Sequence, residues 1–401
     1  MTGRSPAIQV SAVSGLRAES IIAVRDRLSG SHRHLPVIEY STDDHGDLIR
    51  SVRRGRIELD REPVELIMDC QACSIQLDLT RRLGDYAFAG WGSVLLVCLP
   101  PGVSASAVID AVDALDLDGD PVGPGSITTA VDPASLSETL WSAATLADLG
   151  VAVGHNDQPC GEFVVEELLL CDSYVHVVDR LDPDDRDQTL GIELTTHIAP
   201  QSRATMISTD RRPVPLPAPV LGASRFDPVE VAWRTSPATI MIPLDHRGDQ
   251  VRTFLAQTRR PLHPARLEES FTDLAAGCVW TRGRLWIASI PERKLGWTGI
   301  GPKIGFSDCG PWLADRADRP GQSLDTEGML NWHSRYGDRG TWLAFTGEEV
   351  DPADLEAGLA RCALTDQEYA LGPRGWSRYP DPLRLRESFG HDHAASTDLR
   401  I

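Results

Sequence analysis

Residues 7–30 read AIQVSAVSGLRAESIIAVRDRLSG, and this stretch decides the fold of the first half of the chain. Its first seven residues are a short β-rich run. After Gly15, apolar residues recur at helical spacing up to Gly30, a residue type that commonly follows the last turn of a helix. The stretch therefore predicts a strand, a turn and a helix.

The same pattern recurs further along the chain. Apolar, β-branched runs that read as strands lie at 35–40, 64–69, 93–100, 126–131 and 174–179, and helical patterns lie at 104–115 and 135–150. Alternating strands and helices are typical of an α/β fold with a parallel sheet.

The second half of the chain has a different pattern. Residues 209–235 contain five prolines and little periodicity, which favours a linker. Closely spaced strand patterns follow at 277–289, 294–301, 303–308 and 341–347, with helical patterns at 264–277 and 351–364. We therefore expect an α/β domain over 1–208, a linker over 209–235, a small α+β domain over 236–370 and a loosely ordered tail over 371–401.

Length and composition agree with two domains in one chain. The chain has 401 residues, of which 41% are hydrophobic, enough for two cores. No apolar stretch is long enough to span a membrane and the N-terminus lacks the apolar core of a signal peptide, so we expect a cytoplasmic protein. The eight scattered cysteines favour reduced thiols. The net charge of −19 argues against binding to free DNA and favours a protein or ribonucleoprotein partner.

The second domain carries an ordered set of family motifs. Residues 260–267 read RPLHPARL, which resembles the R-P-x-H-P-x-R-L signature of the CobW C-terminal domain, through Arg260, Pro261, His263, Pro264 and Arg266. Further matches follow in the family's order at 280–288, 310–312, 337–339 and 364–368. This resemblance implies a P-loop GTPase-like first domain and a role in zinc homeostasis.

Residues 70–79 of the first domain read CQACSIQLDL, which resembles the family's C-x-C-C metal motif followed by R-x-D-L. Ala72 and Gln76 replace a cysteine and the arginine. The remaining pair, Cys70 and Cys73, is similar to that of the actinobacterial ribosome-hibernation recruitment factors, and WSRYPDP at 376–382 also resembles that branch. The resemblance implies zinc as a ligand and the ribosome or its hibernation factor as the partner.

The turn after the first strand lacks the residues of a P-loop. The GxxxxGK[ST] motif uses backbone amides, a lysine and a hydroxyl to hold phosphates and magnesium. The turn here reads SGLRAES, and the only two lysines, Lys294 and Lys303, lie in the second domain. Arg17 is a planar fork rather than a compact charge, and Glu19 would repel a triphosphate.

Two other nucleotide motifs are also missing. Where the family has an acidic E-x-x-G after its third apolar strand, residues 99–102 read LPPG, so the magnesium partner is absent. The guanine-binding N-K-x-D is replaced at 174–182 by YVHVVDRLD, which keeps only Asp179 and Asp182. GTP hydrolysis is therefore disfavoured, and we assign no catalytic residue and no cofactor-binding residue.

Cys70 and Cys73 are the candidate metal ligands, because four-residue spacing lets two thiolates share one zinc ion. Asp69, Asp44 and His45 could complete the set. The alternatives are redox use and simple packing of two small apolar side chains.

Other candidates have structural explanations. Cys98, Cys278, Cys309 and Cys362 lack a nearby partner in sequence and are expected to pack in the cores. His263 precedes a proline and suits a helix start. His391 and His393 could hold zinc weakly. Most of the tryptophans of the second domain are expected in its core.

The sequence thus predicts a non-catalytic CobW-like adaptor in zinc homeostasis that recruits a hibernation factor to the ribosome under zinc limitation. One alternative is a GTP-dependent zinc metallochaperone. Another is a metal-free scaffold or regulatory protein.

Overall fold

The computed structural model describes residues 8–32, 34–43, 45–88, 93–115, 122–151, 156–210, 226–243, 248–316 and 331–389. The chain forms two compact units, one up to Ala232 and the other from Trp233 onward. This boundary falls inside the 209–235 segment, whose last part is not an extended linker but the helix α7 (Pro228–Thr235). No helix in the described ranges is long and apolar enough to cross a membrane.

The first unit is built on an eight-stranded sheet in the order β4-β3-β2-β5-β1-β6-β7-β8. From β2 to β8 all neighbours in this order are parallel, and β3 and β4 add an antiparallel hairpin at one edge. The strands are β1 (Ile8–Gly15), β2 (Pro36–Thr42), β3 (Leu48–Arg54), β4 (Ile57–Pro63), β5 (Val94–Cys98), β6 (Val122–Val131), β7 (Ser173–Val178) and β8 (Arg203–Ser208).

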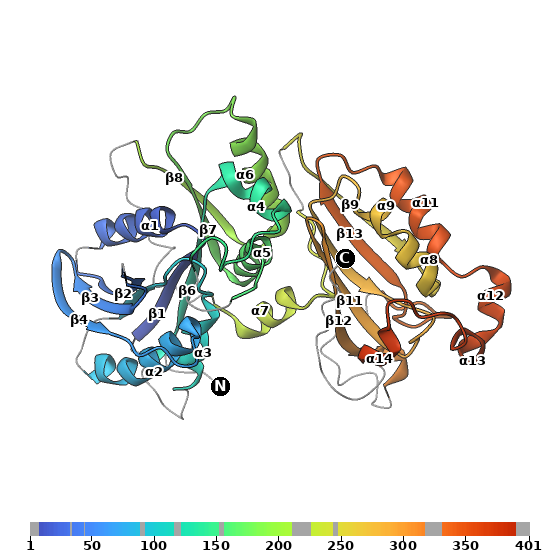
Figure 1. Cartoon of the computed structure of the whole chain (residues 1–401), viewed down its shortest axis with the longest axis horizontal. Helices are drawn as coiled ribbons and strands as arrows, with labels where there is room; N and C mark the ends of the chain where they lie inside the picture. Colours follow the sequence, from blue (N-terminus) through green and yellow to red (C-terminus); the bar gives the residue numbers. More distant parts are fainter. Residues whose placement is uncertain are drawn as a thin grey trace. The chain divides into compact units, whose positions relative to one another are not determined.

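Helices cover both faces of this sheet, with α1 on one side and α2 and α3 on the other (Figure 1). The helical elements are α1 (Ala18–Ser31), α2 (Gln71–Phe88), α3 (Ser106–Asp113), η1 (Pro133–Ser135), α4 (Leu136–Trp141), α5 (Cys160–Leu170) and α6 (Arg186–Ile198). Ile21, Val24 and Leu28 of α1 pack on Val13 of β1 and Leu96 of β5. This is the α/β parallel-sheet architecture that the alternating pattern predicts.

The second unit is built on a five-stranded antiparallel sheet in the order β12-β11-β10-β13-β9. Its strands are β9 (Arg252–Thr258), β10 (Trp280–Leu285), β11 (Arg293–Ile300), β12 (Lys303–Pro311) and β13 (Thr341–Gly347). Its helical elements are α8 (Pro264–Glu269), α9 (Phe271–Ala275), η3 (Leu313–Asp315), α11 (Pro352–Cys362), α12 (Asp366–Ala370), α13 (Gly372–Trp376) and α14 (Leu385–Phe389).

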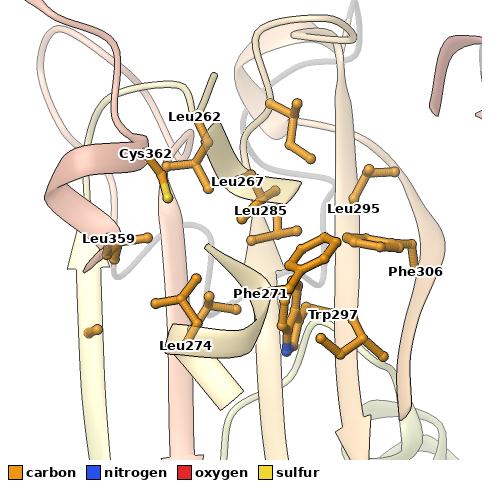
Figure 2. Close-up of a cluster of buried hydrophobic side chains, with 14 of the residues drawn as sticks. Leu262, Leu267, Phe271, Leu274, Leu285, Leu295, Trp297, Phe306, Leu359 and Cys362 are labelled. Atoms are coloured by element: carbon orange, nitrogen blue, oxygen red, sulfur yellow. The ribbon is translucent and has the colours of Figure 1, made fainter. Parts of the chain in front are cut away.

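Apolar side chains from the sheet and the helices form one core in this unit (Figure 2). Phe271 of α9 points at Trp297 of β11, with ring centroids 5.4 Å apart, and Phe306 of β12 packs edge-on against Trp297 at 5.5 Å. Leu359 and Cys362 of α11 close the same core. The α+β prediction for this domain agrees with these elements.

The prediction of a loose tail is wrong for residues 371–389. This segment forms α13 and α14, and Leu383, Leu385 and Phe389 are buried in the core of the second unit. Their apolar side chains explain the order, because burying them stabilises the fold. Residues 390–401, with His391 and His393, lie outside the described residues.

Two predictions in the first unit are also wrong. Residues 64–69 are not a strand: 64–66 have no regular structure, and Met68 and Asp69 form a turn with positive φ angles of 49° and 53°, which end any extended run. The helix predicted over 135–150 stops at Trp141, because the residues that follow form a turn in which Asp148 accepts bonds from the backbone N–H and side-chain hydroxyl of Thr145.

Candidate functional site

The turn that replaces the P-loop is too short to surround a phosphate. β1 ends at Gly15 and α1 begins at Ala18, so only Leu16 and Arg17 connect them. A P-loop has four residues between its two glycines before the lysine begins the helix. Gly15 is required for a different reason, since a Cβ there would lie 2.7 Å from the carbonyl oxygen of Ala130 on β6.

The one cation of this turn is used at the surface. The guanidinium of Arg17 pairs with Asp132 at 3.3 Å, and 54% of its side chain is exposed. Arg17 is the N-cap of α1, but its side chain makes no capping hydrogen bond. Asp132 itself caps η1 by accepting from the N–H of Ala134. The pair therefore joins two helix starts.

A fully buried carboxylate joins this turn to the loop after β5. Glu167 of α5 accepts hydrogen bonds from the hydroxyl of Ser14 and from the hydroxyl of Ser104 at 2.6 Å. The backbone N–H of Ala105, directly before α3, donates to the same carboxylate at 3.2 Å. Burial raises the pKa of Glu167, and the bonds from Ser104, Ser14 and Ala105 oppose that rise.

The two loops also contact each other directly. The N–H of Gly102, within the LPPG segment, donates to the carbonyl of Gly15 at 3.0 Å, and Gly102 has a φ of 74° that suits glycine. The hollow beside this contact has a volume of about 30 Å³ and is lined by Gly15, Arg17 and Glu167, among others. A ligand pocket is usually about 300–1,000 Å³. The space is sufficient for a water molecule and too small for a nucleotide.

The segment that replaces N-K-x-D is also engaged in local bonds. Asp179 accepts from the hydroxyl of Thr209 at 2.9 Å, and Asp182 accepts from the N–H of Asp184 at 3.1 Å. Asp185 caps α6 by accepting from the N–H of Gln188. These carboxylates fix the loop between β7 and α6.

Cys70 and Cys73 are joined to each other by a disulfide, with their Cα atoms 5.3 Å apart. The expectation of reduced thiols is therefore wrong for this pair. It agrees with the other six cysteines, which form no disulfide. Cys70 directly precedes α2 and Cys73 lies exposed in its first turn. Two sulfurs that are bonded to each other are not thiolate ligands.

Among the residues that the structure describes, no third ligand joins this pair. Within the described ranges, no group of three or more histidine, cysteine, aspartate or glutamate side chains is placed to hold a metal ion. His45 and Asp69 are exposed, and Asp44 lies outside the described residues. Structural zinc sites in proteins have four ligands. The residues around Cys70 therefore do not fit a closed zinc site.

Helix α2, which starts at the cysteine pair, is fixed to the sheet by an ion network around a buried arginine, which the sequence did not reveal. Arg50 of β3, only 1% exposed, donates to Asp78 of α2 at 2.7 Å and also pairs with Asp60 at 3.0 Å and Glu62 at 2.6 Å on β4. The hydroxyl of Tyr40 donates to Asp78 at 2.8 Å. Asp78 is the aspartate of the R-x-D-L resemblance, and here it has a structural role.

The free cysteines pack largely as expected. Cys98, Cys278 and Cys362 are buried in the cores, which confirms that prediction for them, and Cys309 is half-buried. Burial raises the pKa of Cys278 to about 12, so it is a thiol at neutral pH.

The signature of the second domain is structural. Arg266 donates to both carboxylate oxygens of Glu368, at 2.8 and 2.9 Å, and to the carbonyl of Ala363. Arg260 pairs with Asp366. These bonds tie α8 and the residues before it to α12 and to Ala363, which follows α11. The Arg266 guanidinium lowers the pKa of Glu368 to about 2.

His263 and its neighbours hold the helix start, as predicted. His263 is the N-cap of α8, with Pro264 in the first turn, but its side chain stacks on Tyr379 at 4.5 Å instead of capping. The carbonyl of Pro261 accepts from the N–H of Leu364 at 2.9 Å. Burial is the largest cause of a lowered pKa for His263.

Most tryptophans of the second unit are buried, which confirms that prediction, and the exceptions are Trp233 and Trp332. Four aromatic rings nonetheless line a hollow of about 320 Å³: Trp286, Tyr336, Tyr369 and Trp376. Arg335 lies over two of these rings, 5.4 Å from the centroid of Tyr336 and 5.3 Å from that of Tyr369.

Comparison with known proteins found one matching domain family, several similar sequences and similar solved structures. Residues 251–363 match the cobalamin synthesis protein cobW C-terminal domain. The chain is 26% identical over 368 residues to a Mycobacterium tuberculosis protein named zinc chaperone Rv0106, covering 86% of each chain. It is 25% identical over 342 residues to the zinc-regulated GTPase metalloprotein activator 1 of Dictyostelium discoideum, covering 81% of this chain and 70% of that one. The Zn(II)-bound YjiA GTPase from E. coli aligns over 89% of this chain at 12% identity, with a TM-score of 0.32.

Proposed function

We propose that this chain, whose residues 251–363 match the cobW C-terminal domain, is a CobW-like, non-catalytic adaptor in zinc homeostasis. In this proposal the first unit keeps the GTPase-like architecture without binding GTP. The second unit contacts a protein or ribonucleoprotein partner.

One observation carries the proposal. The carboxylate of Glu167 joins the turn after β1 to the loop after β5, through Ser14 on one side and Ser104 and Ala105 on the other. In P-loop GTPases, phosphate and magnesium make the contacts that order such loops. Here an internal anion already makes them, and a bound triphosphate would add charge beside a buried carboxylate.

The proposal about zinc rests on the named relatives. One is called a zinc chaperone and another a zinc-regulated GTPase metalloprotein activator. This chain is similar to both relatives and lacks the nucleotide-binding residues, so we propose that it acts in the same zinc-related process as a binding protein. By resemblance to the hibernation recruitment branch, it would bring a hibernation factor to the ribosome under zinc limitation.

The aromatic hollow of the second unit supports a macromolecular partner. Arg335 is exposed and makes no ion pair with any described residue, although it lies over Tyr336 and Tyr369. A guanidinium beside aromatic rings suits an unpaired RNA base with its phosphate. This local cation is compatible with a ribosomal contact despite the acidic charge of the whole chain.

Two measurements test the proposal. A titration with a fluorescent GTP analogue and magnesium should show no saturable binding in the micromolar range. Ribosomes from zinc-starved cells should pull down the chain more strongly than ribosomes from zinc-replete cells. Arg335→Glu should weaken that association, and Arg252→Glu, the same charge change on exposed β9, should not. Equal association at both zinc levels would contradict the recruitment step.

The names of the relatives favour one second candidate, a GTP-dependent zinc metallochaperone. It requires micromolar GTP affinity that magnesium increases, so the same titration decides between the two. The metal-free scaffold is the remaining alternative, and it predicts partner binding that zinc does not alter.

A further inference from the structure

The position of the family's metal motif is occupied by a disulfide. Cys70 and Cys73 are bonded to each other, and the part of the chain that the structure describes provides no third ligand beside them. A zinc site therefore does not explain why two cysteines are kept at this spacing.

The surroundings of the pair keep the two sulfurs within reach of each other, whether or not they are bonded. The N–H of Cys70 donates to the carbonyl of Ile67 at 2.9 Å. The hydroxyl of Ser74 donates to the carbonyl of Cys70 at 2.8 Å, and the N–H of Ile67 donates to that hydroxyl at 2.8 Å. These bonds fix the backbone around Cys70 without using either sulfur.

The pair is also accessible, unlike most other cysteines of the chain. Cys73 is exposed and Cys70 is half-buried, whereas five of the six free cysteines are buried. The N–H of Cys73 points at the sulfur of Cys70, with a nitrogen–sulfur distance of 3.2 Å. An incoming thiol can therefore reach the sulfur of Cys73 from solvent, and Cys70 is positioned as the sulfur that leaves.

We infer that Cys70 and Cys73 form a reversible dithiol–disulfide pair that exchanges with cellular thiols. The reductant is a dithiol protein or two molecules of glutathione. Its first thiolate attacks the sulfur of Cys73, the Cys70–Cys73 bond breaks, and Cys70 leaves as a thiolate that takes up a proton. A second reductant thiol then attacks the mixed disulfide and releases Cys73. Two electrons and two protons pass to the pair, and the reductant becomes a disulfide.

The inference does not depend on the proposed adaptor function. Disulfide exchange at the start of α2 requires neither the absence of GTP binding nor a ribosomal partner. A failed redox test therefore leaves the nucleotide and ribosome experiments unaffected, and the reverse also holds.

The test is a redox titration of the full chain in buffers of reduced and oxidised glutathione, quenched with acid and alkylated under denaturing conditions. Reduced protein should take up label on all eight cysteines, and oxidised protein on six. The transition should follow a two-electron dependence. The Cys70→Ser/Cys73→Ser variant should lose the transition, whereas Cys309→Ser, a half-buried free cysteine, should keep it with one label fewer in both states.

Zinc provides the second arm of the test. Reduced wild-type protein should compete poorly for zinc with a chelator of known affinity, and the double variant should behave in the same way. Tight binding of one zinc ion that is lost in the double variant would overturn the inference and restore the metal site. Failure of the pair to oxidise in oxidised glutathione, with circular dichroism showing a folded protein, would also overturn it.

Discussion

One carboxylate in each unit joins separate segments of the chain, and the two carboxylates have opposite environments. Glu167 is fully buried in the first unit and is held by two serine hydroxyls and one backbone N–H. Glu368 is partly exposed in the second unit and forms a two-bond pair with Arg266. Burial raises the pKa of the first, and the arginine lowers that of the second to about 2.

The comparison shows that the two carboxylates connect their units by different means, hydrogen bonds in one and a salt bridge in the other. The signature arginines of the second unit hold helices together, so any change at those positions costs stability. In the first unit, Glu167 keeps the end of β1 and the loop after β5 in contact.

The largest effect is expected from Glu167→Ala. It leaves the hydroxyls of Ser14 and Ser104 and the N–H of Ala105 without their acceptor and creates a cavity, so we expect a loss of about 3 kcal/mol in the free energy of unfolding. Urea unfolding followed by circular dichroism measures it. Glu166→Ala, the same change at the exposed neighbour, should cost under about 0.5 kcal/mol. Equal costs would mean that Glu167 does not hold the loops.

The second effect concerns the other unit. Arg266→Ala removes the pair with Glu368 and the bond to the carbonyl of Ala363, with an expected loss of about 2 kcal/mol. Arg361→Ala is the control, because its pair with Asp273 spans 3.4 Å and is exposed. Calorimetry should show a lower Tm for Arg266→Ala and almost no change in Tm for Arg361→Ala. A negligible loss in Arg266→Ala would show that the signature is not structural.

The third prediction uses pH, because the pKa values of the two carboxylates are shifted in opposite directions. The pKa of Glu167 is raised in the folded state. Its contribution to stability is therefore fully present below the unfolded-state pKa of about 4.3 and is lost as pH rises through the folded-state pKa. A lowered pKa gives Glu368 a contribution that is present above about 4.3 and is lost as pH falls toward 2. Wild type should therefore lose stability relative to Glu167→Gln, as measured by the difference in Tm, when the pH is raised from 4 to 8. The difference for Glu368→Gln should shift against wild type on going from pH 5 to 2. If the Tm differences of the two variants changed with pH in the same direction, the opposite pKa shifts of Glu167 and Glu368 would be contradicted.

The sequence predicted the second unit better than the first for a physical reason. Its strands β10, β11 and β12 follow one another closely in the chain and pair with their neighbours in sequence, so local pattern was sufficient to predict them. Its core residues, such as Phe271 and Trp297, are large and apolar and were recognisable by type. The tail was missed because α13 and α14 are too short for a periodic pattern.

The candidate site depended on contacts that no local pattern contains. Ser14 and Glu167 are 153 residues apart, and Glu167 lies in a helix whose residues otherwise suggest only packing. The missing lysine and the LPPG segment were visible in the sequence, and they remain the reason to disfavour GTP. The turn at Met68 and Asp69 was missed because non-glycine residues seldom adopt positive φ.

The smallest loss of stability is expected from Arg17→Ala, which also tests whether the turn after β1 binds an anion. Arg17 is the cation of the turn that replaces the P-loop, and its pair with Asp132 at 3.3 Å is largely exposed. Exposed pairs contribute about 0–1 kcal/mol, so the loss should be under about 0.5 kcal/mol. Triphosphate or pyrophosphate should not raise the Tm of either protein. A Tm that rises with pyrophosphate in wild type but not in Arg17→Ala would mean that this turn still holds an anion, and that Glu167 has not replaced the ligand.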